Sequence, residues 1–162
     1  MNRGHCRALI VLAYLALCVG TARAQLSSKK VLTIASAKKI AQAAETEAIK
    51  RHATVAIVVV DEAGYPIYLE RLDDAPVASI EVGIGKARTA AIFRRSTKVF
   101  EDQIRNGRLS PLAIPGATPL QGGLPIIVGG KVIGAIAVSG STAEEDEEIA
   151  KAGTASMAEV IQ

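Results

Sequence analysis

The residues Gly83–Thr89, GIGKART, combine two glycines, a lysine and a threonine, the groups with which a phosphate-binding loop holds a nucleotide. A P-loop also needs a glycine five positions before its Gly-Lys pair and a hydroxyl directly after the lysine. Ile80 and Ala87 occupy those two positions. A dinucleotide fingerprint fails as well, because Arg88 stands where its third glycine belongs. We therefore expect these residues to serve another purpose.

Lys86 and Thr89 are three positions apart, so on a helix they share one face. Lys86 has two open interpretations: it pairs with a ligand carboxylate, or with Asp73 or Asp74. Gly83 and Gly85 would each cost such a helix about 1 kcal/mol relative to alanine. Close approach of a backbone or of a flat ligand would offset that cost.

Other charged residues have structural and functional interpretations. Arg71 and Asp73 alternate onto one side of a predicted strand, which favours an ion pair that anchors the sheet to a helix. The acidic run around Glu144 and Glu147 opens a helix, where the helix dipole and a capping box favour carboxylates. The i, i+3 spacing of Glu144 and Glu147 also allows loose binding of a hard cation.

The chain offers few side chains for nucleophilic or histidine-based catalysis. His52 is the only histidine after residue 24, and both cysteines, Cys6 and Cys18, lie before it. No G-x-S-x-G motif occurs. Asp, Glu and Lys side chains can act as acids or bases when their pKa is shifted, and Glu70, Asp73 and Lys86 are the nearest candidates. Whether the protein is an enzyme stays open.

Residues 1–24 have the pattern of a cleavable signal peptide. Arg3 and Arg7 precede an apolar run of 13 residues at 8–20, and an A-x-A site ends at Ala24. This run is shorter than the about 20 residues that a membrane-spanning helix needs. We predict export, with residues 25–162 as a single domain in the periplasm or the medium. A lipoprotein at Cys18 is the alternative, against which stands the bulky Leu17 where a small residue should precede the cysteine.

The charge of the mature chain gives no argument for an acidic partner. Three of the 19 basic residues and none of the 16 acidic residues lie in 1–24, so the formal charge of 25–162 is zero. The chain has no tryptophan and 3% aromatic residues. Nucleic-acid binding by stacking is therefore not expected.

Hydrophobic periodicity and turn residues define the order of the elements. A helix is expected at about 35–51, and the β-branched run 55–61 predicts a central strand that is covered on both faces. The remaining expected elements are a strand at 67–72, a helix after Pro76, a short helix capped by Ser96 or Thr97, a hairpin with a Gly129-Gly130 turn, and a last helix capped by Thr142. The Pro- and Gly-rich segment 108–123 is expected to be a functional or mobile loop, with room for a further strand.

Three segments resemble one family in order and spacing. They are VVVDEAGYPIYLERLDDA, KARTAAIFRRST and GGLPIIVGGKVIGAIAVSGSTAEEDEEIAKAG. Together they resemble the GlcG/HbpS-like family, also called the haem-degrading domain family, from about Thr33 onward. The matched positions are Asp61, Gly64, Arg71, Asp73, Lys86, Ala87, Thr89, Ala90, Gly122, Gly123, Pro125, Gly134, Gly140 and Asp146.

The resemblance implies a profilin-like α/β/α fold with a five-stranded antiparallel sheet, and frequently a homo-oligomer. It also implies haem as a suspected ligand, in some members with haem breakdown, and it transfers no catalytic residue. The expected pocket lies between the helix 83–93 and the loop 113–123. Its candidate residues are Lys86, Thr89, Arg71, Asp73, Thr118, Gly122, Gly123 and His52, and Glu144 and Glu147 are the weak metal candidates.

These observations leave three alternative functions. The first is an exported protein that binds haem or a similar flat carboxylated molecule, with Lys86 or Arg71 facing its carboxylates. His52 is then either an axial iron ligand or a helix C-terminal histidine that the dipole favours. The second is an enzyme or accessory protein for a small organic acid, and the third an oligomeric signalling or scaffold partner without a ligand.

Overall fold

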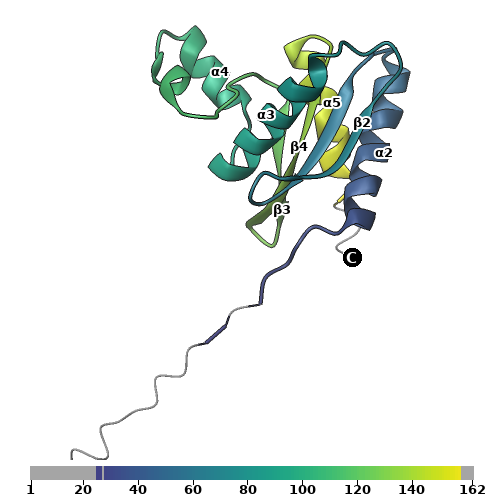
Figure 1. Ribbon diagram of the computed structural model, residues 1–162, viewed down its shortest axis with the longest axis vertical. Helices are drawn as coiled ribbons and strands as arrows, with labels where there is room; N and C mark the ends of the chain where they lie inside the picture. Colours follow the sequence, from purple (N-terminus) through teal and green to yellow (C-terminus); the bar gives the residue numbers. More distant parts are fainter. Residues whose placement is uncertain (1–24, 27, 158–162) are drawn as a thin grey trace, which may run out of the picture.

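The structure, a computed structural model, describes residues 25–26 and 28–157 (Figure 1). The predicted signal peptide at 1–24 lies outside the described residues. The predicted order of helices and strands is confirmed. The elements are α2 (Ile34–Lys50), β1 (Ala56–Asp61), β2 (Pro66–Arg71), α3 (Ser79–Phe93), α4 (Lys98–Arg105), the 3-10 helix η1 (Ser110–Ala113), β3 (Gly123–Val128), β4 (Lys131–Ser139) and α5 (Ala143–Ala155).

The strands form one antiparallel sheet in the order β2-β1-β4-β3. β1 is central and pairs with both β2 and β4, and its residues 56–60 are buried, as the β-branched run predicts. The mixed α/β class with an antiparallel sheet is thus confirmed. The prediction of five strands is wrong for the described residues, which contain four.

The segment between α4 and β3 does not supply the missing strand. It contains η1 and has prolines at 111, 115 and 119. Proline has no N–H for a ladder hydrogen bond, so three prolines in nine residues prevent strand pairing. The segment instead packs against the middle of α3, where Thr118 N donates to Thr89 Oγ1.

Helices cover both faces of the sheet (Figure 1). Because successive side chains of a strand point to opposite faces, Ile57 and Val59 pack in the core under α2 and α5, and Val58 and Val60 pack under α3. The α3 side is built from small residues such as Ala87, so this helix lies close to the sheet. The profilin-like assignment itself stays a prediction.

α4 and η1 form an arm that stands away from the body of the molecule (Figure 1). Phe100 of α4 packs edge-on against Phe93 at the end of α3, with ring centroids 5.3 Å apart. At its base Thr97 Oγ1 accepts a hydrogen bond of 2.9 Å from Gly123 N. Thr97 therefore bonds to β3 and makes no side-chain cap on α4. Ser96, the other predicted cap, accepts a hydrogen bond from Lys98 N through its Oγ.

Among the helices of the described residues, none combines the length and the apolar composition that crossing a bilayer requires.

Candidate functional site

A buried ion pair joins α3 to α5. Lys86 Nζ lies 2.8 Å from Asp146 Oδ2 and also donates to Val138 O at 3.1 Å. The two residues are 3% and 2% exposed. The predicted partners of Lys86, Asp73 and Asp74, are wrong, because both lie exposed in the turn after β2 while the lysine side chain runs inward to the first turn of α5.

Asp146 also accepts a hydrogen bond of 3.1 Å from Ser141 N, so both of its carboxylate oxygens have partners. Burial raises the pKa of Asp146 above its ordinary value, although the charge of Lys86 and the backbone N–H of Ser141 act in the opposite direction. In the effect on this pKa, the removal of the carboxylate from water therefore outweighs its contacts with Lys86 and Ser141.

Gly122 and Gly123 pack directly on Lys86. A Cβ atom on Gly122 would lie 3.0 Å from Lys86 Nζ and 2.8 Å from Val138 O, and one on Gly123 would lie 2.7 Å from Lys86 O. Gly122 also has a φ of 118°, which side chains rarely adopt. The close approach that these glycines allow is therefore made by the protein's own chain.

Thr89 and Thr118 lie together at the junction of α3 and the loop. Thr89 Oγ1 donates to Gly85 O at 2.8 Å and accepts from Thr118 N at 2.8 Å. No side chain fits on Gly85, because the Thr118 hydroxyl occupies that place. The loop does pack against α3, and at this place Thr89 and Thr118 hold the loop to the helix.

A groove of about 330 Å³ lies beside the ion pair. Its lining includes Lys86 and Asp146, the start of α3 at Ser79 and Val82, and the loop residue Gln121. It opens where the N-terminal ends of α3 and α5 meet the loop and α4. The site thus gathers polar groups from four separate parts of the chain.

Gln121 is a residue of this groove that the sequence analysis missed. Its side chain is 5% exposed, and its Oε1 has no hydrogen-bond partner among the described residues. Its backbone N–H is fixed by Glu101 Oε2 of α4. A single glutamine in a loop gives no periodic or motif signal, so only its position in the fold makes it a candidate.

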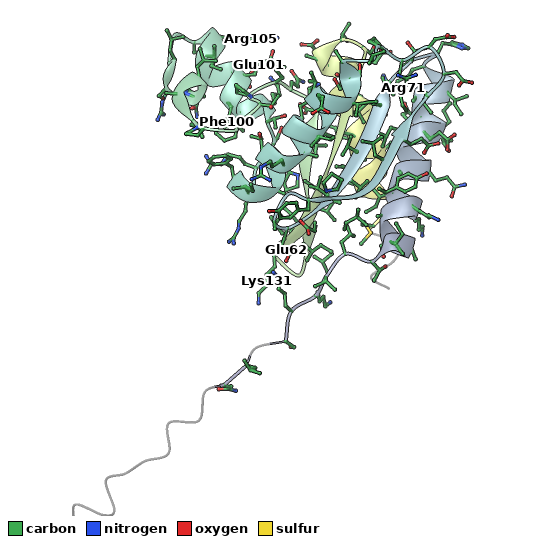
Figure 2. The ribbon with its side chains drawn as sticks, in the orientation of Figure 1. Glu62, Arg71, Phe100, Glu101, Arg105 and Lys131 are labelled. Carbon is green, nitrogen blue, oxygen red and sulfur yellow. The ribbon has the colours of Figure 1, made fainter. Side chains whose placement is uncertain are left out.

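Arg71 and Asp73 do not meet at this site. Arg71 ends the edge strand β2 (Figure 2), and both side chains are exposed. Within the part of the chain that the structure describes, neither makes an ion pair. The predicted anchoring pair is therefore wrong, because the end of an edge strand lies in water and not under a helix.

His52 lies in the turn after α2, is exposed and has a φ of 55°. Glu144 is exposed and lies 3.9 Å from an Arg105 nitrogen, whereas Glu147 is buried and pairs with Lys151 at 3.1 Å. In the described residues no three His, Cys, Asp or Glu side chains gather as a metal site. The structure therefore separates the predicted iron and cation candidates from the groove.

A larger cavity, of about 810 Å³, lies at the β3–β4 hairpin. The chain at residues 28–30 forms one wall, and Ile127 and Val132 of the hairpin form an apolar wall. The cations that line it are Lys29, Lys30, Arg94 and Lys131. Lys131 lies at the hairpin tip, far along the sheet from Arg71 (Figure 2).

Comparison with known proteins now identifies the class. Residues 32–155 match the family described as "Haem degrading protein HbpS-like". The chain is also 41% identical over 115 residues to Protein GlcG of Escherichia coli (strain K12), which covers 70% of this chain and 85% of GlcG. The chain belongs to the HbpS-like family.

A second relative is an uncharacterized 15.0 kDa protein from the dhaT-dhaS intergenic region of Citrobacter freundii, 40% identical over 124 residues and covering 74% of this chain and 87% of that protein. Among solved structures, HbpS aligns with a TM-score of 0.75 and 31% identity over 85% of this chain and 97% of its own. ORFY of Klebsiella pneumoniae aligns with a TM-score of 0.75 and 30% sequence identity, over 83% of this chain and 97% of its own. A complex of PduOC with haem aligns with a TM-score of 0.72 and 25% sequence identity, over 78% of this chain and 95% of its own.

Proposed function

We propose that this protein is exported and that its mature chain, residues 25–162, binds haem in the cavity at the β3–β4 hairpin. Membership of the HbpS-like family and the similarity to a PduOC–haem complex support haem as the ligand. The proposed location rests on one observation: this cavity combines sufficient volume, an apolar wall and clustered cations. Small-molecule sites typically occupy about 300–1,000 Å³.

The residues present fit the porphyrin and its carboxylates. Ile127 is 54% exposed although it is large and apolar, and it offers a surface for the flat macrocycle. Lys30, Arg94 and Lys131 make no ion pair within the described residues, so they remain available to the two propionates. Lys29 is already paired with Glu62.

The described lining of the cavity contains no His, Cys, Met or Tyr side chain. His52 lies at the end of α2 and does not line it. The proposed binding therefore rests on the macrocycle and the propionates. Haem supplies iron redox chemistry when it is bound, and what this chain contributes in the proposal is apolar contact and positive charge.

A spectroscopic haem titration of the mature chain tests the proposal. We expect a saturable Soret change at micromolar haem. The double variant Arg94→Glu/Lys131→Glu reverses two cavity charges and should weaken binding at least tenfold. Lys38→Glu, which changes an exposed cation of α2 outside the cavity, is the matched control and should bind as the parent does.

His52→Ala decides the role of the imidazole. It should leave the affinity and the Soret position unchanged if haem lies at the hairpin. A loss of the Soret change in this variant, or no saturable change in the parent protein, contradicts the proposed site. Export has its own test: the protein recovered from the periplasm should begin at Gln25.

The predicted homo-oligomer also belongs to the proposal. The arm of α4 and η1 carries three apolar residues that are exposed, Val99, Leu109 and Leu112. Exposed apolar residues that gather in one patch mark protein–protein contact sites. We propose that the arm contacts a second copy of the chain.

A further inference from the structure

The groove beside the Lys86–Asp146 pair has no part in the haem proposal, yet one of its groups lacks a partner. Gln121 is 95% buried, lines the groove, and has no hydrogen-bond partner at Oε1 in the described chain. Leaving a buried acceptor unpaired costs folding free energy. A ligand in the groove with an O–H or N–H group would remove that cost.

The charges around the groove disfavour an anionic ligand. Lys86 is the one cation among the described lining residues, and Asp146 and the carbonyl of Val138 already accept its hydrogen bonds. Glu101 adds a second carboxylate, which pairs with Arg105, a residue outside the groove lining, at 2.6 Å. A carboxylate in the groove would therefore meet two carboxylates and no free cation.

The remaining lining suits a short, partly apolar molecule. Ser79 and Ser139 line the groove with hydroxyl groups, which can both donate and accept, and the Ser141 hydroxyl, which already donates to Glu145, can still accept. Pro76 and Val82 present carbon atoms on the side of α3. The volume of about 330 Å³ is at the small end of ligand sites.

We propose that this groove binds a small uncharged hydroxylated compound. One ligand hydroxyl donates to Gln121 Oε1, further hydroxyls meet the serines, and the carbon chain packs against Val82. The buried Lys86–Asp146 pair positions the surrounding elements and does not bind the ligand carboxylate that the sequence suggested. The proposal does not depend on haem binding.

Glycerol and glycerate are matched probes, because they differ in a single terminal group. In ¹⁵N-labelled protein, glycerol should produce saturable chemical-shift changes at the Gln121 side-chain amide and at the Ser141 backbone amide. Glycerate should bind at least tenfold more weakly. Equal binding of the two probes, or glycerol shifts spread over the surface without saturation, overturns the proposal.

Two variants separate binding from folding. Gln121→Met keeps the length of the side chain and removes the unpaired acceptor, so it should weaken glycerol binding at least tenfold without lowering the stability of the free protein. Gln42→Met, on the surface of α2 and outside the groove, is the matched control and should bind as the parent does. Unchanged glycerol binding by Gln121→Met overturns the assignment of Oε1.

Val82→Phe provides a second test should Gln121→Met fold poorly. The larger side chain fills the groove from α3 and should abolish the glycerol shifts, and persistent shifts at Gln121 contradict the site. Both groove variants should keep the Soret titration of the parent. A haem titration that fails in the parent while glycerol binding holds would refute the haem proposal alone.

Discussion

Lys86 and Asp146 bring opposite charges into a part of the fold where water does not reach them. Each needs the other, because a lone buried charge is far less stable than a buried pair. Val138 O and Ser141 N complete their hydrogen bonds. At the scale of single residues, the pair is therefore a structural requirement of the α3–α5 contact.

We expect Lys86→Met to lower the free energy of unfolding by about 3–5 kcal/mol, because Asp146 is then buried without its cation. The double variant Lys86→Met/Asp146→Leu should recover a large part of that loss. Urea unfolding followed by circular dichroism measures both values.

Lys98→Met is the matched control for this prediction. Lys98 pairs with Asp102 on the surface of α4, so its removal should cost less than about 1 kcal/mol. If Lys86→Met also lowers the free energy of unfolding by less than about 1 kcal/mol, or if the double variant recovers none of the loss, the buried pair is not required.

The raised pKa of Asp146 predicts a pH dependence. Between the ordinary pKa of an aspartate and its raised folded value, the folded chain binds more protons than the unfolded chain. This contribution to stability is thus present at low pH and lost as the pH rises through the folded pKa. The stability advantage of the parent over Asp146→Asn should shrink from about pH 4 upward.

Urea unfolding of the parent and of Asp146→Asn between pH 4 and 7 measures this trend. An advantage that grows with pH would show that Lys86 and the N–H of Ser141 dominate over burial at Asp146. In that case the pKa of the carboxyl is lowered, and the sign given above is wrong.

At the scale of elements, the loop before β3 depends on one hydroxyl. Thr89 Oγ1 links the α3 backbone at Gly85 to the loop backbone at Thr118. Thr89→Val keeps the shape and removes both hydrogen bonds, at a cost of about 1–3 kcal/mol for the unpaired groups. We expect the loop to open more often, and trypsin to cleave faster after Arg108.

Thr46→Val is the control for the loop. Thr46 lies on the exposed side of α2, and its hydroxyl donates to Gln42 O within its own helix. Equal cleavage rates of Thr89→Val and the parent after Arg108 would show that other contacts hold the loop.

Most elements could be predicted because their signals are local. The β-branched run at 55–60 and the Gly129-Gly130 turn, with positive φ at both glycines, decide conformation within a few residues. The prediction of a fifth strand was wrong because the prolines in the loop before β3 cannot donate ladder hydrogen bonds. The resemblance to a family could not reveal that.

The contacts of the site were harder to predict because they connect distant residues. Lys86 and Asp146 are 60 positions apart. Spacing along α3 shows which face Lys86 occupies, but only the packing of α5 decides its partner. The nearer acidic residues, Asp73 and Asp74, were therefore the wrong choice, and Gln121 carried no signal at all.

On the scale of the whole molecule, the two cavities differ in character. The hairpin cavity is large and lined by four cations, whereas the groove is small and its lysine is paired. Different ligands are therefore expected at the two places. The two places have no lining residue in common, so each can be tested without the other.

The arm of α4 and η1 makes the prediction that belongs to the assembled molecule. Leu109 and Leu112 are 61% and 62% exposed on an element that stands off the body. A contact with a second copy would remove this apolar surface from water, at about 25 cal/mol for each Å² buried. We expect Leu109→Glu/Leu112→Glu to lower the mass measured by sedimentation, while the thermal midpoint of the separated chains stays near that of the parent.

Ile49→Glu is the control for the arm, because Ile49 is also 61% exposed but lies on α2. Its variant should keep the mass of the parent. If the arm variant does so too, the oligomer uses another surface, and if the parent sediments as a single chain the proposed oligomer is wrong. A drop in mass for the arm variant alone would place the contact at η1, beside the groove residues Glu101 and Leu120, so that a second copy would lie next to the groove opening.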